Sequence, residues 1–317
     1  MLLSVKDLEV SYPLRGSLFG KKRFLKAVRG VSFELDKGEI LGLVGESGCG
    51  KSTIGRALVR LEKPSAGSIM LNGVDLAQAE GRLLAEHRKD FQMVFQDPYG
   101  SLNPRLTIFS ALDEVLKLHC KGDLRSRRAR AAELLVRVGL DADYLDRYPH
   151  QFSGGQRQRI GIARALAANP LFIVADEPVS ALDVSVQASV VNLLDDIRKE
   201  TGCSFIFIAH DLAVVEHISD RIIVMYLGKI VESAPAHELV GNPRHPYTEA
   251  LLSAVPEVKN SGREKIVLSG DVPSPLEPPS GCPFHPRCRR CLDICRTTDP
   301  QWQCADGHGF ACFNPVG

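Results

Sequence analysis

The stretch Gly45-Glu46-Ser47-Gly48-Cys49-Gly50-Lys51-Ser52-Thr53 decides the fold class of this chain. It fits the pattern GxxxxGK[ST] and follows the mostly apolar run Ile40–Val44, which is typical of a buried central strand. A helix is expected directly after it, over Ile54–Leu61. A strand, a glycine-rich turn and a helix in this order form a loop whose backbone N–H groups cradle phosphates. The glycines are needed because a Cβ would obstruct that curl.

Each polar residue of the motif has an expected role. Lys51 supplies a point charge to the β- and γ-phosphates of a nucleotide, and Ser52 supplies a hydroxyl ligand for Mg²⁺. Cys49 is interpreted as a small residue that the loop tolerates. Because a helix N-terminus lowers a thiol pKa, Cys49 is also a candidate for alkylation.

The bulk properties are those of an ordinary globular protein. The chain has 317 residues, is 44% hydrophobic and 24% charged, and carries a net charge of +1. No overall field would draw it onto nucleic acid or an anionic membrane. No apolar run approaches the ~18 residues of a spanning helix, and acidic residues interrupt the N-terminal stretch where a signal peptide would be apolar. We therefore expect a cytosolic chain that meets a membrane only through partners.

Hydrophobic periodicity indicates an α/β fold. Residues 2–11 and 28–35 alternate apolar and polar side chains, as half-buried strands do. Apolar runs over 171–175 and 204–209 predict buried strands, with an amphipathic helix over 184–200 between them. Helical spacing over 107–147 predicts a separate helical subdomain, and residues 15–24 form a basic, glycine-bearing insertion. Strands separated by helices favour a largely parallel sheet.

Two carboxylates, Asp176 and Glu177, follow the apolar run at 171–175. Asp176 is suited to hold Mg²⁺, directly or through water, and Glu177 to orient or deprotonate the water that attacks a γ-phosphate. An acidic pair at the end of a strand is common by itself. After a phosphate loop it becomes strong evidence for nucleotide hydrolysis.

The run Phe152-Ser153-Gly154-Gly155-Gln156 makes the interpretation specific. By itself Ser-Gly-Gly predicts a turn and a helix N-cap. In this context the chain resembles the ABC (ATP-binding cassette) ATPases, whose signature is commonly LSGGQ, with Phe152 in place of leucine. The resemblance covers about residues 2–240.

Further motifs of that family occur in the expected order. The resemblance implies that Gln96 senses Mg²⁺ and a transmembrane partner, that Asp183 belongs to a loop crossing to the other subunit, and that His210 contacts the γ-phosphate. It also implies that Tyr12 stacks on adenine. A tyrosine in a strand needs no ligand, so a structural role for Tyr12 stays open.

The resemblance has a mechanistic consequence. In the family, the signature serine and glycines complete the ATP site of the opposite subunit, which implies that Ser153 and its neighbours act in a dimer. ATP would then hold two cassettes together and hydrolysis would release them, a population shift driven by differential affinity for the closed state.

Two regions outside the cassette motifs narrow the resemblance. Residues 97–105 and the run 242–252 are similar to those of the dipeptide/oligopeptide importer ATPases, and the insertion at 15–24 to the second ATPase of such importers, the DppF/OppF type. This implies peptide uptake, with a sister ATPase, two permeases and an extracytoplasmic peptide-binding protein as partners, and a place at the cytoplasmic face of the cell (inner) membrane. Nickel, glutathione or oligosaccharide import, and a non-transport ABC protein acting on ribosomes or DNA, remain alternatives.

Six of the nine cysteines crowd the last part of the chain, while Cys49, Cys120 and Cys203 are scattered. In a reducing compartment such crowding indicates a metal site before it indicates disulfides. The importer resemblance implies a [4Fe–4S] cluster on Cys282, Cys288, Cys295 and Cys312. Four thiolates suit Zn²⁺ equally, and the CxxC at Cys288–Cys291 favours it. Free thiols, or a tail fold held by packing alone, are the remaining alternatives, and Cys291 and Cys304 leave the ligand set open.

The sequence therefore predicts an α/β P-loop NTPase of the ABC cassette type. Its expected parts are a mainly parallel core sheet, an antiparallel β subdomain, an inserted helical subdomain at about 105–160, and a small cysteine-rich C-terminal extension. The expected division is a nucleotide-binding domain over 1–240 and the extension over 241–317. ATP and Mg²⁺ are the expected substrate and cofactor.

Overall fold

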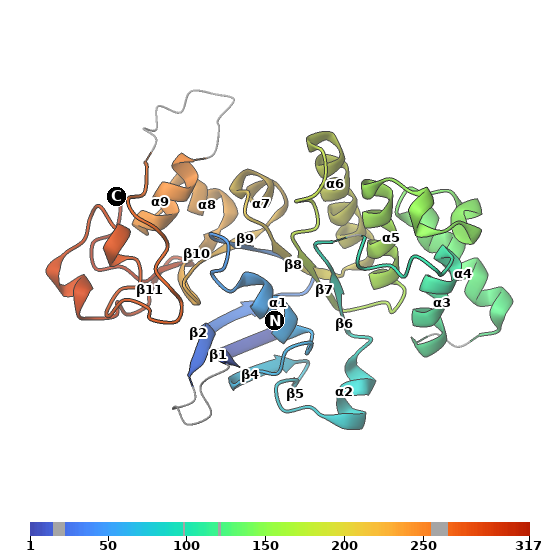
Figure 1. The fold of residues 1–317 in the computed structure, drawn as a ribbon, viewed down its shortest axis with the longest axis horizontal. Helices are drawn as coiled ribbons and strands as arrows, with labels where there is room; N and C mark the ends of the chain where they lie inside the picture. Colours follow the sequence, from blue (N-terminus) through green and yellow to red (C-terminus); the bar gives the residue numbers. More distant parts are fainter. Residues whose placement is uncertain (15–22, 98, 120–121, 255–265) are drawn as a thin grey trace. The chain divides into compact units, whose positions relative to one another are not determined.

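The computed structural model describes residues 1–14, 23–97, 99–119, 122–254 and 266–317. The chain forms two compact units (Figure 1). Unit 1 comprises Met1–Asp36, Ile40–Gln78 and Ala209–Gly317, and unit 2 comprises Lys37–Glu39 and Ala79–Ile208. Cys120 and most of the basic insertion, residues 15–22, lie outside the described residues.

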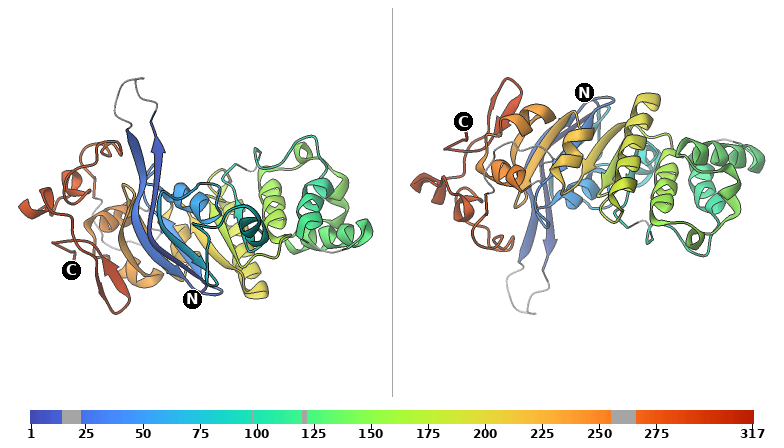
Figure 2. Two further views of the ribbon diagram at one scale, coloured as in Figure 1. Left: turned by 90° about the horizontal axis from the view of Figure 1, so that it is seen from below. Right: turned by 90° about the horizontal axis from the view of Figure 1, so that it is seen from above.

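Unit 1 contains an antiparallel sheet in the order β2-β1-β4-β5. Strands β1 and β2 lie side by side in both views of Figure 2 and pair from Leu3↔Leu35 to Pro13↔Phe24. The predicted strands at 2–11 and 28–35 are thus confirmed, and both extend toward the insertion. Alternation of apolar and polar residues buries one face of this sheet. The strands are β1 (Leu3–Pro13), β2 (Phe24–Leu35), β4 (Ala66–Leu71) and β5 (Val74–Asp75).

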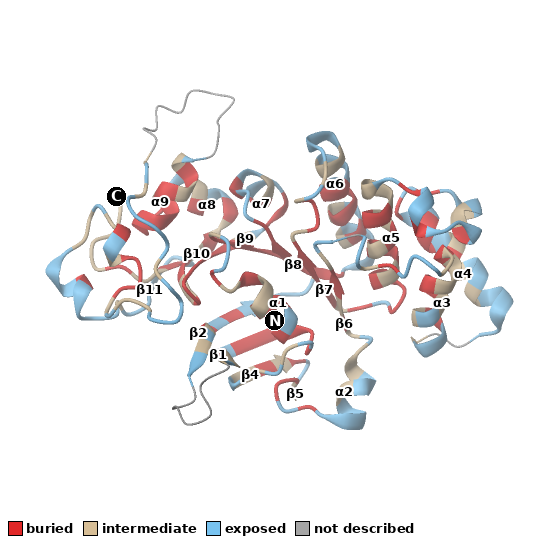
Figure 3. Ribbon diagram, in the orientation of Figure 1, coloured by how far each residue is buried: buried red, intermediate tan, exposed pale blue. Residues whose placement is uncertain are grey.

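A second set of strands in unit 1 carries the phosphate loop. Strand β3 (Ile40–Val44) is buried along its whole length and pairs parallel to β9 (Arg221–Tyr226). Figure 3 colours the ribbon by burial, with buried residues in red. Strand β10 (Lys229–Pro235) pairs antiparallel with β9. The helices of this unit are α1 (Lys51–Leu58), α7 (Leu212–Ile218), α8 (Ala236–Gly241) and α9 (Pro246–Ser253). Gly42 lets α7 approach β3, since a Cβ there would lie 2.3 Å from Cγ1 of Val215.

Unit 2 holds the parallel strands β6 (Phe91–Val94), β7 (Phe172–Asp176) and β8 (Ser204–Ile208), with β7 in the middle. Its helices are α2 (Gly81–His87), α3 (Ile108–His119), α4 (Leu124–Arg137), α5 (Gly154–Leu166) and α6 (Val184–Thr201), with 3₁₀ turns at Ala142–Asp146 and Pro149–Gln151. The two buried strands, the helix between them and the helical character of 107–147 match the sequence prediction. Within the described residues, no helix is long and apolar enough to span a bilayer.

The C-terminal tail contains regular structure that hydrophobic periodicity did not reveal. Two 3₁₀ turns, His285–Arg287 and Asp293–Arg296, precede a hairpin of β11 (Gln303–Ala305) and β12 (His308–Phe310). Strand β12 joins the edge of β10 through the pair Glu232↔Phe310. Three-residue strands carry too little alternation to be recognised, and this hairpin depends on a partner strand far away in the sequence.

Candidate ATP site

The phosphate loop has a backbone that only glycines adopt readily. Gly45, Gly48 and Gly50 have φ angles of 151°, 79° and 107°. A Cβ on Gly50 would lie 2.4 Å from the Ala27 carbonyl oxygen, and one on Gly45 would lie 2.3 Å from the Met225 carbonyl oxygen. Nothing lies within 4 Å of a Cβ position on Gly48. The loop is therefore tightly packed at Gly45 and Gly50, whereas the space beside Gly48 is open.

Helix α1 begins inside the motif. Its N-cap, Gly50, is left-handed and offers no side-chain cap to the first turn. The predicted start at residue 54 was therefore too late, and the predicted end at residue 61 is also wrong. The helix ends at Leu58, with Arg60 in a left-handed conformation (φ 54°). An uncapped N-terminus leaves backbone N–H groups available for an anion.

Lys51 lies across the curl of the loop. Its Nζ donates to the carbonyl oxygens of Gly45 at 2.7 Å and Glu46 at 3.1 Å, and the side chain is almost fully buried. Ser52 follows it in the first turn of α1. The ammonium group is thus held at the loop, where a phosphate-binding lysine is needed.

Cys49 contradicts the alkylation hypothesis. Its thiol is buried, and burial raises its pKa although Lys51 opposes the shift. Desolvation of the buried thiolate therefore outweighs the effect of the helix N-terminus on the Cys49 pKa. The interpretation of Cys49 as a small residue within the loop agrees with this packing.

Two more predicted residues of unit 1 lie close to the loop or its strand. The Tyr12 hydroxyl is hydrogen-bonded to the side chain of Thr53, the last motif residue, and burial raises the Tyr12 pKa. His210 is exposed and follows Ala209, whose N–H donates to the Leu43 carbonyl at 3.3 Å. The structure thus brings Tyr12 to the motif and places His210 just after a residue bonded to β3.

The acidic pair lies at the end of β7 in unit 2. Asp176 is buried, and Nε2 of Gln96 donates to Oε2 of Glu177 at 2.7 Å. Glu177 has a φ of 46°, a left-handed backbone that non-glycine residues rarely adopt and that recurs at functional positions. Two predicted site residues of unit 2, Gln96 and Glu177, are therefore joined by a direct hydrogen bond.

The signature segment begins helix α5 as predicted. Ser153 is its N-cap, with the hydroxyl accepting from Gln156 N–H at 3.3 Å and the Gln156 side chain accepting from Ser153 N–H at 3.0 Å. A Cβ on Gly155 would lie 2.5 Å from Cγ1 of Val186, in the first turn of α6. Asp183, the N-cap of α6, is exposed. Within unit 2 the signature and the Asp183 loop therefore lie against each other.

The thiols of the tail cysteines lie near enough to interact electrostatically, but among the described residues they form no metal site. Burial raises the pKa of Cys282 to about 12, and the nearby thiols of Cys288, Cys295 and Cys312 act in the same direction. Cys291 is hydrogen-bonded to Cys295, and Cys304 is exposed. Among the described residues, no three Cys, His, Asp or Glu side chains are gathered so as to hold a metal ion. The predicted tail metal site thus gains no support from these positions.

One residue of the motif has partners that the sequence prediction missed. Glu46 is bonded by Tyr247 of α9 and by Arg287 of the tail. These residues lie 201 and 241 positions from Glu46, so no local pattern could have revealed them.

A parallel strand leading into an open glycine loop, an uncapped helix and a buried lysine defines unit 1 as a nucleotide-binding unit of the P-loop class. With the acidic pair and the capped signature helix of unit 2, the class is an ATP-binding cassette. Comparisons with known proteins agree. Residues 28–180 match the model of the ABC transporter family, and residues 231–295 match that of the oligopeptide/dipeptide transporter C-terminal region.

The relatives narrow the class to one group. The chain is 53% identical to the oligopeptide transport ATP-binding protein AppF of Bacillus subtilis, over 98% of this chain and 96% of that protein. It is 49% identical to the dipeptide transport ATP-binding protein DppF of Escherichia coli, over 98% of this chain and 94% of that protein. The chain belongs to the ATP-binding proteins of the oligopeptide/dipeptide ABC transporters.

Solved structures support the cassette fold. A dimeric, post-hydrolysis state of the cassette MJ0796 bound to ADP and Pi superposes with a TM-score of 0.66 at 28% identity, covering 74% of this chain and 99% of that one. The cbiO1 protein of Clostridium perfringens, part of the transporter complex cbiONQ, superposes with a TM-score of 0.66 at 26% identity, covering 76% and 91%.

Proposed function

We propose that this chain hydrolyses ATP to ADP and phosphate and thereby drives the import of small peptides across the cell membrane. The observation that carries the peptide assignment is the match of residues 231–295 to the oligopeptide/dipeptide transporter C-terminal region, on the same chain as the cassette motifs. The names of the relatives, which refer to oligopeptide and dipeptide transport, support the same cargo. Cargo such as nickel, glutathione or oligosaccharides finds no support in these names.

Within unit 1 the loop would hold the ATP phosphates. The open face at Gly48, the N–H groups at the uncapped start of α1 and the ammonium of Lys51 are complementary to a polyphosphate. Lys51 would exchange its bonds to the Gly45 and Glu46 carbonyls for phosphate oxygens. Tyr12, half-buried and bonded to Thr53, would lie against the adenine, and His210 would contact the γ-phosphate.

Most of the remaining roles belong to unit 2, and Ser52 of unit 1 contributes to one of them. Glu177 would take the proton of the attacking water, and the bond from Gln96 orients its carboxylate. Ser52, Gln96 and Asp176 offer the oxygen ligands that Mg²⁺ prefers. When bound, Mg²⁺ supplies positive charge to the phosphate oxygens. Ser153, Gly154, Gly155, Gln156 and Asp183 would act on the ATP of a second cassette, so a working site would require a dimer.

The partners follow from this assignment. A sister cassette, two permeases and an extracytoplasmic peptide-binding protein would complete the importer, and the chain would be peripheral, at the cytoplasmic face of the membrane. Genes for a peptide-binding protein and two permeases beside the gene for this chain would support the proposal. Co-sedimentation with ribosomes in place of permeases would contradict it.

The catalytic assignment is tested with Glu177→Gln in the assembled importer. Removing the base should lower phosphate release by at least about 100-fold, while MgATP binding persists and a closed, ATP-bound dimer accumulates. Asp143→Asn is the matched control. It likewise replaces an acidic side chain by its amide, but on an exposed 3₁₀ turn, and should leave turnover unchanged. Rapid phosphate release by Glu177→Gln would contradict the assignment.

A [4Fe–4S] cluster on Cys282, Cys288, Cys295 and Cys312 belongs to the same proposal. What supports a shared site is the proximity of the four thiols, since those of Cys288, Cys295 and Cys312 all help to raise the pKa of Cys282. Four thiolates also suit Zn²⁺. A brown chromophore in anaerobically purified protein is the expected result, and colourless protein with stoichiometric zinc would refute it.

A further inference from the structure

The second residue of the phosphate loop is held by the C-terminal extension. Nη1 of Arg287 donates to Oε2 of Glu46 at 2.7 Å, and Nη2 donates to Oε1 at 3.1 Å. The backbone N–H of Glu46 donates to the Tyr247 hydroxyl at 2.8 Å. We call Arg287 and Tyr247 the Glu46 clamp. They hold Glu46 through both its carboxylate and its backbone N–H. A bidentate arginine fixes the orientation of the carboxylate as well as its distance.

The clamp is rigid on the side of the extension. The Arg287 side chain is 8% exposed, and Tyr247 is fully buried. The ring of Tyr247 packs against Tyr226 and Phe284, with centroids 4.7 Å and 5.3 Å away. Because these rings are interlocked, neither Tyr247 nor the turn that carries Arg287 can shift without disturbing buried packing.

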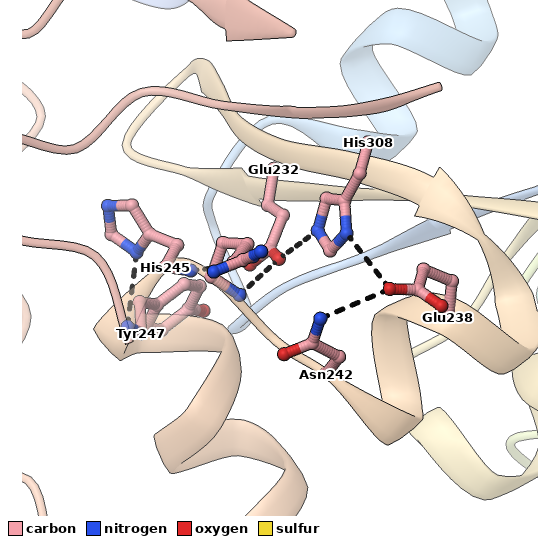
Figure 4. Close-up of polar contacts among 7 residues, drawn as sticks. Glu232, Glu238, Asn242, His245, Tyr247 and His308 are labelled. Carbon is pink, nitrogen blue, oxygen red and sulfur yellow. Dashed lines mark hydrogen bonds and ion pairs between the residues drawn. The ribbon is translucent and has the colours of Figure 1, made fainter. Parts of the chain in front are cut away.

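A second buried contact anchors the extension to strand β10. The carboxylate of Glu232, fully buried, accepts from the N–H groups of Arg244 and His245 and from Nε2 of His308 (Figure 4). One carboxylate thus ties the segment before α9 and the β12 hairpin to the same strand. The clamp is therefore mounted on elements that are fixed to the core of unit 1.

The position of Glu46 in the loop makes this contact significant. Its carbonyl oxygen accepts from Lys51 Nζ at 3.1 Å, so Glu46 lies between the phosphate-binding lysine and the extension. We propose that Arg287 and Tyr247 are positioning residues for ATP binding, which hold Glu46 and thereby the curvature of the phosphate loop. The C-terminal extension, which distinguishes the oligopeptide/dipeptide transporter group, would then also contribute to ATP binding. This inference rests on the proposed binding of ATP at the loop.

The test measures MgATP affinity of the full-length chain and the ATP dependence of hydrolysis in the assembled importer. Arg287→Ala should raise Kd and KM for ATP about 10-fold, with a change in kcat below about 3-fold, because a charge-assisted contact that orients the loop is lost. Arg287→Lys, which keeps the charge but loses the fork, should recover part of the affinity. Tyr247→Phe keeps the ring and should raise Kd about 3-fold.

Arg289→Ala is the matched control. Arg289 lies two residues from Arg287, is 54% exposed, and pairs with Glu249 of α9 at 2.8 Å. Its Kd should stay within about 2-fold of the wild type. The double variant Arg287→Ala/Glu46→Gln should have a Kd no higher than that of Arg287→Ala alone. Both substitutions remove the same contact, the ion pair between Arg287 and Glu46, so their effects should not add.

Two outcomes would overturn the inference. One is wild-type Kd in both Arg287→Ala and Tyr247→Phe, and the other is an equal loss in Arg289→Ala, which would indicate general damage to the tail. If Arg287→Ala does not fold, Tyr247→Phe and Arg287→Lys decide the question. A wild-type chain that binds no ATP would instead refute the proposed function and is distinguishable on that ground.

Discussion

Helices α1 and α5 both begin with glycine-rich segments, yet their first turns are built in opposite ways. Helix α1 starts from the left-handed Gly50 and has no side-chain cap. Helix α5 starts from the extended Ser153, whose hydroxyl closes a capping box with Gln156. A third helix of comparable interest, α9, is capped by His245, whose Nδ1 accepts from Tyr247 N–H at 3.1 Å.

The difference separates a helix start that is complete from one that awaits an anion. In α5 the Ser153 hydroxyl already satisfies one of the orphan backbone donors, so its structure is supported by its own side chains. In α1 the N-cap is Gly50, which has no side chain to act as a cap, and tight packing surrounds its left-handed backbone. Similar glycine-rich sequence therefore builds a helix start without a side-chain cap in α1 and one with a capping box in α5.

The largest expected effect distinguishes the glycines of the two starts. Gly50→Ala should destabilise the chain by about 3 kcal/mol, because alanine opposes a positive φ and its Cβ would meet a carbonyl oxygen. Gly155→Ala should cost about 1 kcal/mol, since that residue is helical and meets only the Val186 side chain. Urea unfolding of both variants measures the contrast, and equal losses would remove the distinction.

A pH titration should separate the histidine cap of α9 from the serine cap of α5. Complete burial lowers the pKa of His245 from 6.5 to about 4. The unfolded chain then binds a proton that the folded chain excludes, so stability present above pH 6.5 is lost as the pH falls toward 4. At pH 5 the loss relative to pH 7 should be on the order of 2 kcal/mol.

His245→Asn keeps a capping side chain without this titration and is the control for the pH experiment. Comparing the urea midpoints of wild type and variant at pH 7 and pH 5 isolates the contribution of His245. A wild type that loses no more stability than the variant would show that His245 is not the group responsible.

The smallest expected effect is that of the serine cap on stability. Ser153→Ala should lower the free energy of unfolding by about 1 kcal/mol, because Gln156 N–H loses its acceptor. Thermal unfolding would report this as a shift of about 2 °C. ATP affinity of the isolated chain should stay unchanged, and a fall in that affinity would place Ser153 in the chain's own site instead of a partner's.

Much of the fold was accessible from local patterns. The buried strands near residues 40, 172 and 204 were recognised because each is a short apolar run next to a motif or an amphipathic helix. The N-cap at Ser153 was recognised because capping chemistry involves residues only three positions apart. The boundaries of α1 were not, since the helix starts at a backbone conformation that no side-chain pattern encodes.

Sequence by itself determined the class of protein and the chemistry of its loop, because glycines, lysine and carboxylates at fixed spacing specify where phosphate, metal and water can bind. Tertiary structure alone decided that Cys49 is buried and that Arg287 and Tyr247 hold Glu46. Those contacts join residues that are up to 241 positions apart and have no periodic signal. They exist only because buried aromatic packing and the Glu232 carboxylate bring the extension to the phosphate loop.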